Sequence, residues 1–250
     1  MRRTLAFISR NFKEILRDPI SYAFGLGLPV VMLIAMTAIN SAIPPEAAVD
    51  IFKIKNLSCG IAVFSLTFVM LEGSILVSKD RSGAFLTRLY SSPMRAEEFI
   101  IGYAVPLAAV AVCQIAITFL ASAVVGAVVG ETLVLGGILC SFAALLPAAL
   151  FFVGLGIAFG FLLGQTSAPP VCSFVITASG LLGGIWFDCA SVGGAFETVC
   201  RVLPFFNATD AARLAMSGGE GFLVPVLITA AYAVGSLGLA CVTFLISRKR

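Results

Sequence analysis

Residues 77–100, VSKDRSGAFLTRLYSSPMRAEEFI, join two long apolar segments and decide how the chain is organised. Seven of the 20 residues from Lys79 to Glu98 are charged, whereas charged residues make up only 12% of the whole chain. A polar loop between two apolar runs is typical of a chain that leaves the lipid and enters it again. We therefore expect this loop to lie outside the bilayer, where a partner can contact it.

Composition places most of the remaining chain in lipid. The residues AVILMFWYC make up 60% of the 250 positions; adding the glycines and leaving out the tyrosines gives about 68%. Soluble domains have roughly 45–50% apolar residues. The sequence therefore indicates a polytopic membrane protein, built as one transmembrane domain over residues 1–250.

The sequence lacks the residues that most enzymes use. Histidine is absent, which removes the usual general base and most zinc chemistry. None of the five lysines follows a glycine, so there is no Walker A motif for phosphate binding, and there is no GxSxG or HExxH motif. We expect a chain that is not itself an enzyme and that binds no metal or cofactor.

Six segments are long and apolar enough to be candidate spans, since a helix needs about 20 apolar residues to cross the hydrocarbon layer. They are Tyr22–Ile43, Leu57–Ser78, Ile101–Val129, Leu133–Leu163, Pro169–Phe187 and Phe222–Ser247. The third and fourth contain Pro106 and Pro147, where tilt or kinking is expected. Gly130, Glu131 and Thr132 separate these two spans, which predicts a tight hairpin.

The distribution of Lys and Arg predicts the orientation. With both termini inside, the inner segments hold twelve of these residues: five before Tyr22, four in the Val77–Ile100 loop and three at the C-terminus. The outer segments hold four. By the positive-inside rule both termini and the loop are cytoplasmic.

Residues 1–19 predict an amphipathic helix at the inner membrane interface. An apolar stripe faces lipid, and a basic face lies on anionic headgroups. The stripe is Leu5, Ile8, Phe12, Ile15 and Leu16, and the basic face is Arg2, Arg3, Arg10, Lys13 and Arg17. Phe7 lies off the stripe, and Asp18-Pro19 ends the helix. The alternative is a basic topology anchor with no further role.

A few polar side chains lie inside the predicted spans. Glu72 is seven residues before Lys79, and a carboxylate there should face protein or water rather than lipid. It is a candidate for an inner gate, a substrate contact, a link to the loop below or a structural hydrogen-bonded carboxylate. Gln114, Thr118 and Ser122 form one stripe, facing a pathway or joining helices.

Glycines also recur at helical spacing in the third and fourth spans. Gly156, Gly160 and Gly164 repeat every four residues, and Gly126 with Gly130 repeats the spacing. Small residues at this spacing let helices approach closely. The pattern fits packing within the chain or a seam between subunits.

The segment 188–221 lies on the predicted outer side and is only moderately polar. We expect it to dip partly back into the outer leaflet, with a helix over Ala208–Met216 that stops at Gly218-Gly219. Cys189 and Cys200 are both in this segment, and a disulfide between them requires an oxidising space.

Three stretches together resemble the permease subunits of type-2 ABC exporters, also called ABC-2 permeases. In the Val77–Ile100 loop the similarity lies in Asp80-Arg81, Gly83, Arg88-Leu89 and Ser92-Pro93. NFKEILRDPISYAFGLGLPVVMLI (residues 11–34) resembles the connecting helix and first span, with Arg17-Asp18-Pro19. LPFFNATDAARLAMSGG (residues 203–219) resembles the segment before the last span.

The resemblance implies an all-α fold of six transmembrane helices with both ends inside. It includes an interfacial connecting helix, a cytoplasmic coupling helix and a partly re-entrant outer segment. It implies that residues 79–98 dock a separate ATP-binding subunit, which supplies all ATP and Mg²⁺ chemistry. The implied coupling residues are Asp80, Arg81, Gly83, Leu86, Arg88, Leu89, Tyr90 and Pro93, with the connecting helix represented by Arg10, Lys13, Arg17 and Asp18.

The implied assembly is a permease dimer, of identical or different subunits, in the inner membrane of a prokaryote. The expected cargo is apolar or amphipathic, and nucleic acid is not an expected partner. Two other readings stay open: an ATP-independent transporter or channel, and a membrane assembly protein that transports nothing. Glu72 is the only ionisable residue in the predicted spans, which is few for an ion-coupled carrier.

Overall fold

The computed structural model describes the whole chain except residues 1, 20–22, 45–49, 84–94 and 250. Over these residues the protein is built from helices, and no strand is found among them. The elements are α1 Arg2–Leu16, η1 Ala23–Gly27, α3 Leu28–Ala42, η2 Asp50–Phe52, α4 Ile54–Ser82, α6 Ala96–Val129, α7 Leu135–Leu162, α8 Ala168–Leu182, α9 Cys189–Val192, α10 Gly194–Val202, α11 Pro204–Ser217 and α12 Leu223–Lys249.

Five helical segments of the described chain are long and apolar enough to cross a membrane. They are Ala23–Ala42, Ile54–Ser82, Glu97–Val129, Leu135–Leu162 and Leu223–Ser247. They match five of the six predicted spans. Both α6 and α7 continue through their internal prolines, Pro106 and Pro147.

The predicted fifth span is shorter than expected. Instead of Pro169–Phe187 the structure has α8, which covers Ala168–Leu182. At about 1.5 Å per residue its 15 residues reach only about 22 Å, less than the roughly 30 Å of hydrocarbon. The helix ends there because Gly183 is followed by Gly184, whose φ of 63° is left-handed.

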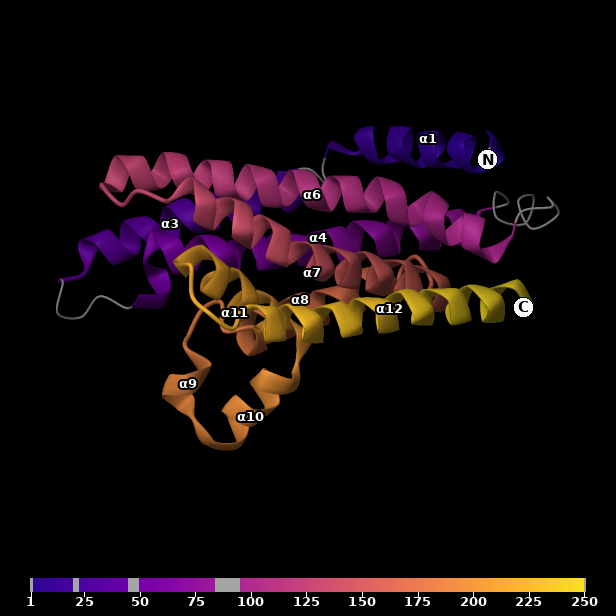
Figure 1. Ribbon diagram of the computed structural model, residues 1–250. Coiled ribbons are helices and arrows are strands. Elements are labelled where there is room, and N and C mark those ends of the chain that lie inside the picture. The colour runs from indigo at the N-terminus through magenta and orange to yellow at the C-terminus, as the bar shows by residue number, and fades with distance from the viewer. Residues whose placement is uncertain (1, 20–22, 45–49, 84–94, 250) are drawn as a thin grey trace.

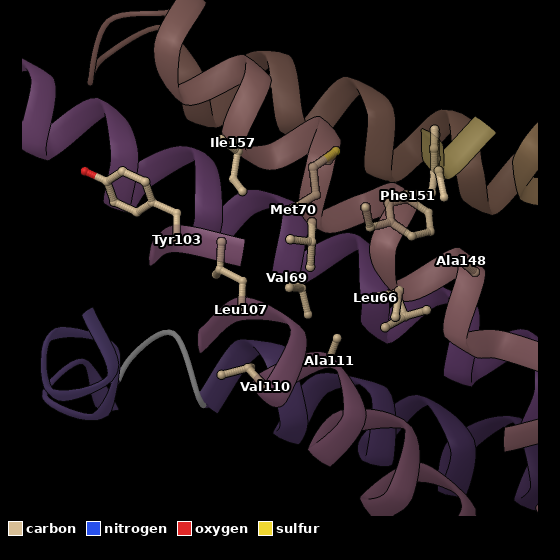
Figure 2. Packing of buried hydrophobic residues seen from close by; sticks show 14 of the residues in the cluster. Leu66, Val69, Met70, Tyr103, Leu107, Val110, Ala111, Ala148, Phe151 and Ile157 are labelled. Carbon is tan, nitrogen blue, oxygen red and sulfur yellow. The ribbon is translucent and has the colours of Figure 1, made fainter. Parts of the chain in front are cut away.

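The centre of the bundle is α4, which packs against α3, α6, α7, α8 and α11. Of its 18-residue apolar window 83% is buried inside the protein, against 28% for α12. Figure 2 shows Leu66, Val69 and Met70 of α4 between the side chains of α6 and α7. A helix that is covered on all sides has no polar face, which explains why the α4 sequence lacks a clear amphipathic period.

Two glycines of α7 bring its backbone against α4. A Cβ on Gly156 would lie 2.6 Å from the carbonyl oxygen of Met70, and one on Gly160 would lie 2.5 Å from Cβ of Val77. A Cβ on Gly164 would meet nothing within 4 Å. Gly156 and Gly160 therefore serve packing within the chain. The alternative prediction, that these two glycines form a seam between subunits, is wrong.

The other glycine pair shapes a turn. Gly130 ends α6 with a left-handed φ of 84°, and a Cβ on Gly126 would collide with the carbonyl oxygen of Glu131. The predicted tight hairpin between α6 and α7 is confirmed, with α7 beginning at Leu135.

Both termini lie at one end of the bundle, as Figure 1 shows. The same end holds α1, the last turn of α4 and the first turn of α6, and we call it the termini end. The opposite end holds η2, the turn between α6 and α7, and the α9–α10 lobe. The two helix ends that flank the polar loop therefore lie at the same end of the bundle as the termini, and their side of the membrane stays a prediction.

The segment before the last helix returns to the bundle. After α9 and α10, α11 packs against α7, α12 and α4. The predicted helix over Ala208–Met216 is confirmed, and it begins earlier because Pro204 occupies its first turn. It stops at Gly218, whose φ is 66°. Cys189 and Cys200 are buried free thiols.

Candidate functional site beside the polar loop

The helix α1 packs against the bundle through a face that shares only Ile15 with the predicted apolar stripe. Phe7, Asn11 and Ile15 are buried, at a spacing of four residues that places them on one face. Leu5 and Leu16, from the predicted stripe, are 63% and 65% exposed. The helix thus has two apolar faces, one against protein and one left for lipid, and the sequence pattern revealed only the second.

Phe7 anchors α1 on the first turns of α6. Its ring lies edge-on to Tyr103, with 5.0 Å between ring centroids, and 6.0 Å from Phe99. A Cβ on Gly102 would collide with this ring. The absence of a side chain at Gly102 is therefore what lets α1 approach α6.

Next to Phe7, Arg10 of α1 reaches Asp80 in the last turn of α4. Both guanidinium Nη atoms donate to the carboxylate, with Nη2 2.7 Å from Oδ1. Tyr103 of α6 donates its hydroxyl to Oδ2 of Asp80 at 2.8 Å. Asp80 is only 4% exposed, so these bonds satisfy a buried carboxylate. Three helices meet at this one side chain.

Asn11 and Arg10 are held in the same network. Arg10 donates to Oδ1 of Asn11 at 2.9 Å, and Asn11 donates from Nδ2 to the carbonyl oxygen of Gly102 at 2.9 Å. Burial by itself would lower the pKa of Arg10, but the hydrogen bond and charge of Asp80 outweigh it and raise that pKa above its ordinary value. The guanidinium therefore stays charged.

Two further contacts join α1 to the helix ends on either side of the loop. Lys79 of α4 donates to Oε1 of Glu14 at 2.7 Å, and this hydrogen bond lowers the pKa of Glu14. Thr4 donates to Glu98 of α6 at 3.2 Å, while Glu98 caps α6 by accepting from the backbone N–H of Arg95. We call this set the loop-flanking cluster: Thr4, Phe7, Arg10, Asn11, Glu14, Lys79, Asp80, Glu98 and Tyr103.

The last turn of α4 is also tied to α7. Arg81 donates from Nη1 to the carbonyl oxygen of Phe161, one residue before α7 ends. Ser82 donates to Oε1 of Gln165 at 3.3 Å. The last turn of α4 is therefore bonded to α1, α6 and α7.

The structure places the predicted coupling residues unevenly. Residues 79–82 belong to α4 and residues 96–98 to α6, so the connection between the helices is shorter than the predicted 79–98 loop. Asp80 and Arg81 bond within the chain, whereas Gly83 is exposed at the end of α4, with its N–H on the carbonyl of Lys79. The remaining predicted coupling residues lie outside the described residues: Leu86, Arg88, Leu89, Tyr90 and Pro93.

On the connecting helix, Lys13 and Arg17 are exposed, as an outward basic face requires, and Asp18 is exposed just after the helix. Tyr103 and Asn11 belong to the site but were not among the predicted site residues. Asn11 carried a signal, since a polar residue four positions from both Phe7 and Ile15 points to a buried hydrogen bond.

The predicted intramembrane residues separate into two groups. Glu72 and Gln114 both lie beside Gly25 of η1, where a Cβ would be 3.0 Å from Oε1 of Glu72 and 2.7 Å from Nε2 of Gln114. Thr118 and Ser122 instead bond the carbonyls one turn back in α6, each at 2.8 Å. Their hydroxyls therefore do not join neighbouring helices.

A comparison with protein families finds a match over most of the chain. Residues 2–217 match the family model described as ABC-2 type transporter, which includes α1, the loop-flanking cluster and α11. No curated protein sequence matches the chain. Because the family model covers most of its length, the chain belongs to the ABC-2 type transporter family.

Proposed function

We propose that this chain is the permease subunit of an ATP-driven exporter, and that a separate ATP-binding subunit docks at the termini end. Membership of the ABC-2 family supports the permease role, since the family generally works with an ATP-binding subunit. The proposal includes a second permease subunit, identical or different, and an inner-membrane location in a prokaryote. ATP and Mg²⁺ are bound by the partner.

One observation carries the proposal beyond family membership: Asp80, three residues before the exposed Gly83, is bonded to both α1 and α6. A partner that pushes on the loop moves the end of α4. Through Arg10 and Tyr103 that movement reaches α1 and α6, and through Arg81 it reaches α7. Packed helices shift as units, so a small displacement at the loop becomes a rocking of the bundle.

In this account the coupling residues have two different tasks. Asp80 and Arg81 are positioning residues, which pass a movement into the bundle without touching the partner. The partner contacts fall to the exposed end of α4 at Gly83 and to the predicted residues Leu86, Arg88, Leu89, Tyr90 and Pro93. Tyrosine and arginine are among the residues enriched where two proteins bind most tightly, which favours Tyr90 and Arg88 as the main contacts.

The cargo follows from the walls of the bundle. The spanning helices carry large exposed apolar side chains, for example Leu120, Leu139 and Val234. A path along such surfaces favours an apolar or amphipathic molecule that leaves the inner leaflet, rather than a strongly hydrated ion.

The test is affinity purification of the tagged chain from its native membrane in mild detergent, followed by ATP hydrolysis on the eluate. We expect a second chain with a Walker A motif and measurable hydrolysis. Arg81→Glu should lower that hydrolysis, whereas Arg201→Glu, an equal charge reversal in α10 at the opposite end, should not. A chain that purifies alone and inert favours the autonomous carrier or the assembly protein instead.

A further inference from the structure

A cleft opens beside the end of α1. It has a volume of about 80 Å³ and lies between the end of α1 and one face of α4. Its α4 wall is Glu72, Ile75, Leu76 and Lys79, which share a face because they are spaced by three, one and three residues. From Lys79 to Glu72 the cleft descends about two turns, or roughly 10 Å, into the bundle.

The floor of the cleft is a carboxylate that no described residue hydrogen-bonds. Glu72 is 9% exposed, and within the described part of the chain neither of its side-chain oxygens accepts a hydrogen bond. Next to it, the fully buried Gln114 also leaves its amide nitrogen and oxygen unbonded. A buried polar group without a partner is costly, and a carboxylate is costlier than an amide. A group that donates to Glu72 would remove this cost.

The charge of the lining selects the kind of donor. Among the described residues that line the cleft are three acids, Glu14, Asp18 and Glu72, and one cation, Lys79. The Lys79 ammonium already lies 2.7 Å from Glu14, so this cation is paired at the edge of the cleft and not with Glu72 at its floor. That contact also shows the chemistry that the cleft favours, an ammonium group donating to a carboxylate.

A metal ion fits less well than an organic cation. Among the described residues no group of three or more Asp, Glu, His or Cys side chains is placed to hold a metal. The cleft also has an apolar part, made of Ile15, Ile75 and Leu76. Roughly 10–15 Å³ is enough for one water-sized group, so the cleft has room for a head group and the start of a chain.

We infer that this cleft binds the ammonium head group of an amphiphilic amine, with Glu72 as the acceptor and the apolar tail leaving along α1 toward the inner leaflet. The exposed Leu5 and Leu16 place α1 at a lipid surface, so an amphiphile can reach the mouth without crossing water. As a binding site this stands on the cleft alone; as the entry site of an exported substrate it rests on the proposed function.

The test measures binding of dodecylammonium to the purified chain in nanodiscs of neutral lipid at pH 7, with empty nanodiscs as background. Dodecanol and dodecyl sulfate have the same alkyl chain without the positive charge. We expect saturable binding of dodecylammonium alone. We expect Glu72→Gln to weaken it at least tenfold, and Glu220→Gln, an equal charge change at an exposed site in the opposite loop, to leave it unchanged.

Equal binding of dodecanol and dodecylammonium by the wild-type protein would overturn the inference, and this comparison needs no variant. Unchanged affinity for dodecylammonium in a folded Glu72→Gln protein would also overturn the inference. Glu72 would then have a structural role only. Neither result touches the exporter proposal, because that proposal is tested by the partner subunit and its ATP hydrolysis. If binding is confirmed but no ATPase accompanies the chain, the site stands and the exporter proposal fails.

Discussion

Asp80 and Arg10 are 70 residues apart in sequence, yet both guanidinium Nη atoms of Arg10 donate to the Asp80 carboxylate. Asp80 is 4% exposed at this contact and its other bond comes from Tyr103. The relationship joins α1 to the end of α4, three residues before the exposed Gly83. We therefore expect α1 and the end of α4, which are far apart along the chain, to move together.

Removing either partner should destabilise the protein, because the other charge is left without its hydrogen bonds. We expect Asp80→Ala and Arg10→Ala each to lower the midpoint of thermal unfolding in detergent. In a double-mutant cycle the pair should show a coupling of about 1–3 kcal/mol. If the changes in the free energy of unfolding caused by the two substitutions add to within about 0.5 kcal/mol, the contact contributes nothing to stability.

The approach of α1 to α6 depends on Gly102. A valine there forces the Phe7 ring out of its position against Tyr103, so Gly102→Val should detach α1 while the spans stay folded. Limited proteolysis within residues 2–16 should become faster. Gly238→Ala is the matched control, because a Cβ there meets nothing and alanine favours a helix. Equal protease resistance of wild type and Gly102→Val would show that α1 is held in another way.

The α4–α7 contact gives a third prediction. Gly156→Leu pushes its side chain into the backbone of Met70, which should prevent close packing and cost about 1–3 kcal/mol or more. Gly164→Leu, two turns further along, should be tolerated. Thermal unfolding in detergent reports packing within the chain, and the monomer-to-dimer ratio reports contact between subunits. If Gly156→Leu changes dimerisation and leaves the unfolding midpoint unaltered, Gly156 lies at a contact between subunits instead.

The Glu14–Lys79 pair predicts a modest pH dependence. The pKa of Glu14 is lowered in the folded protein by the hydrogen bond from Lys79, so its contribution is present above its ordinary pKa of 4.5. That contribution is lost as the pH falls through the folded pKa. The side chains are 28% and 55% exposed, so the pair contributes at most about 1 kcal/mol.

The measurement is the difference in unfolding midpoint between wild type and Glu14→Gln, taken at pH 7 and at pH 3. The difference should favour the wild type at pH 7 and become smaller at pH 3, and salt should reduce it at pH 7. A difference that is the same at both pH values would assign the effect of the substitution to packing.

Much of the fold follows from the sequence because hydrophobic length sets the spans directly. Five predicted spans are helices of suitable length, and the turn at Gly130 and the stop at Gly218 follow from local backbone preferences. The fifth span was predicted too long because Ile185, Trp186 and Phe187 are apolar although the helix has already ended at Leu182. Apolar residues are found both in lipid and in the protein interior, so composition alone does not show that α8 ends at Leu182.

The candidate site was less predictable, for a different reason. Helical periodicity reveals a face toward lipid, but it does not tell which second face meets protein, so the pattern gives Phe7 no role. The partner of Asp80 could not be read from the chain either, because Arg10 and Tyr103 are brought to it only by the packing of α1 and α6 on α4. Tertiary contacts decide the roles of such residues.

The most direct test of the central claim places a photo-crosslinking amino acid at Gly83, the last described residue before the loop, in the chain expressed in its native membrane. The same amino acid at Glu220, in the opposite loop, is the control. The account predicts that irradiation links position 83, but not position 220, to a nucleotide-binding chain with a Walker A motif, and that added ATP changes the yield. Crosslinks from position 83 only to lipid or to this chain itself would contradict the account.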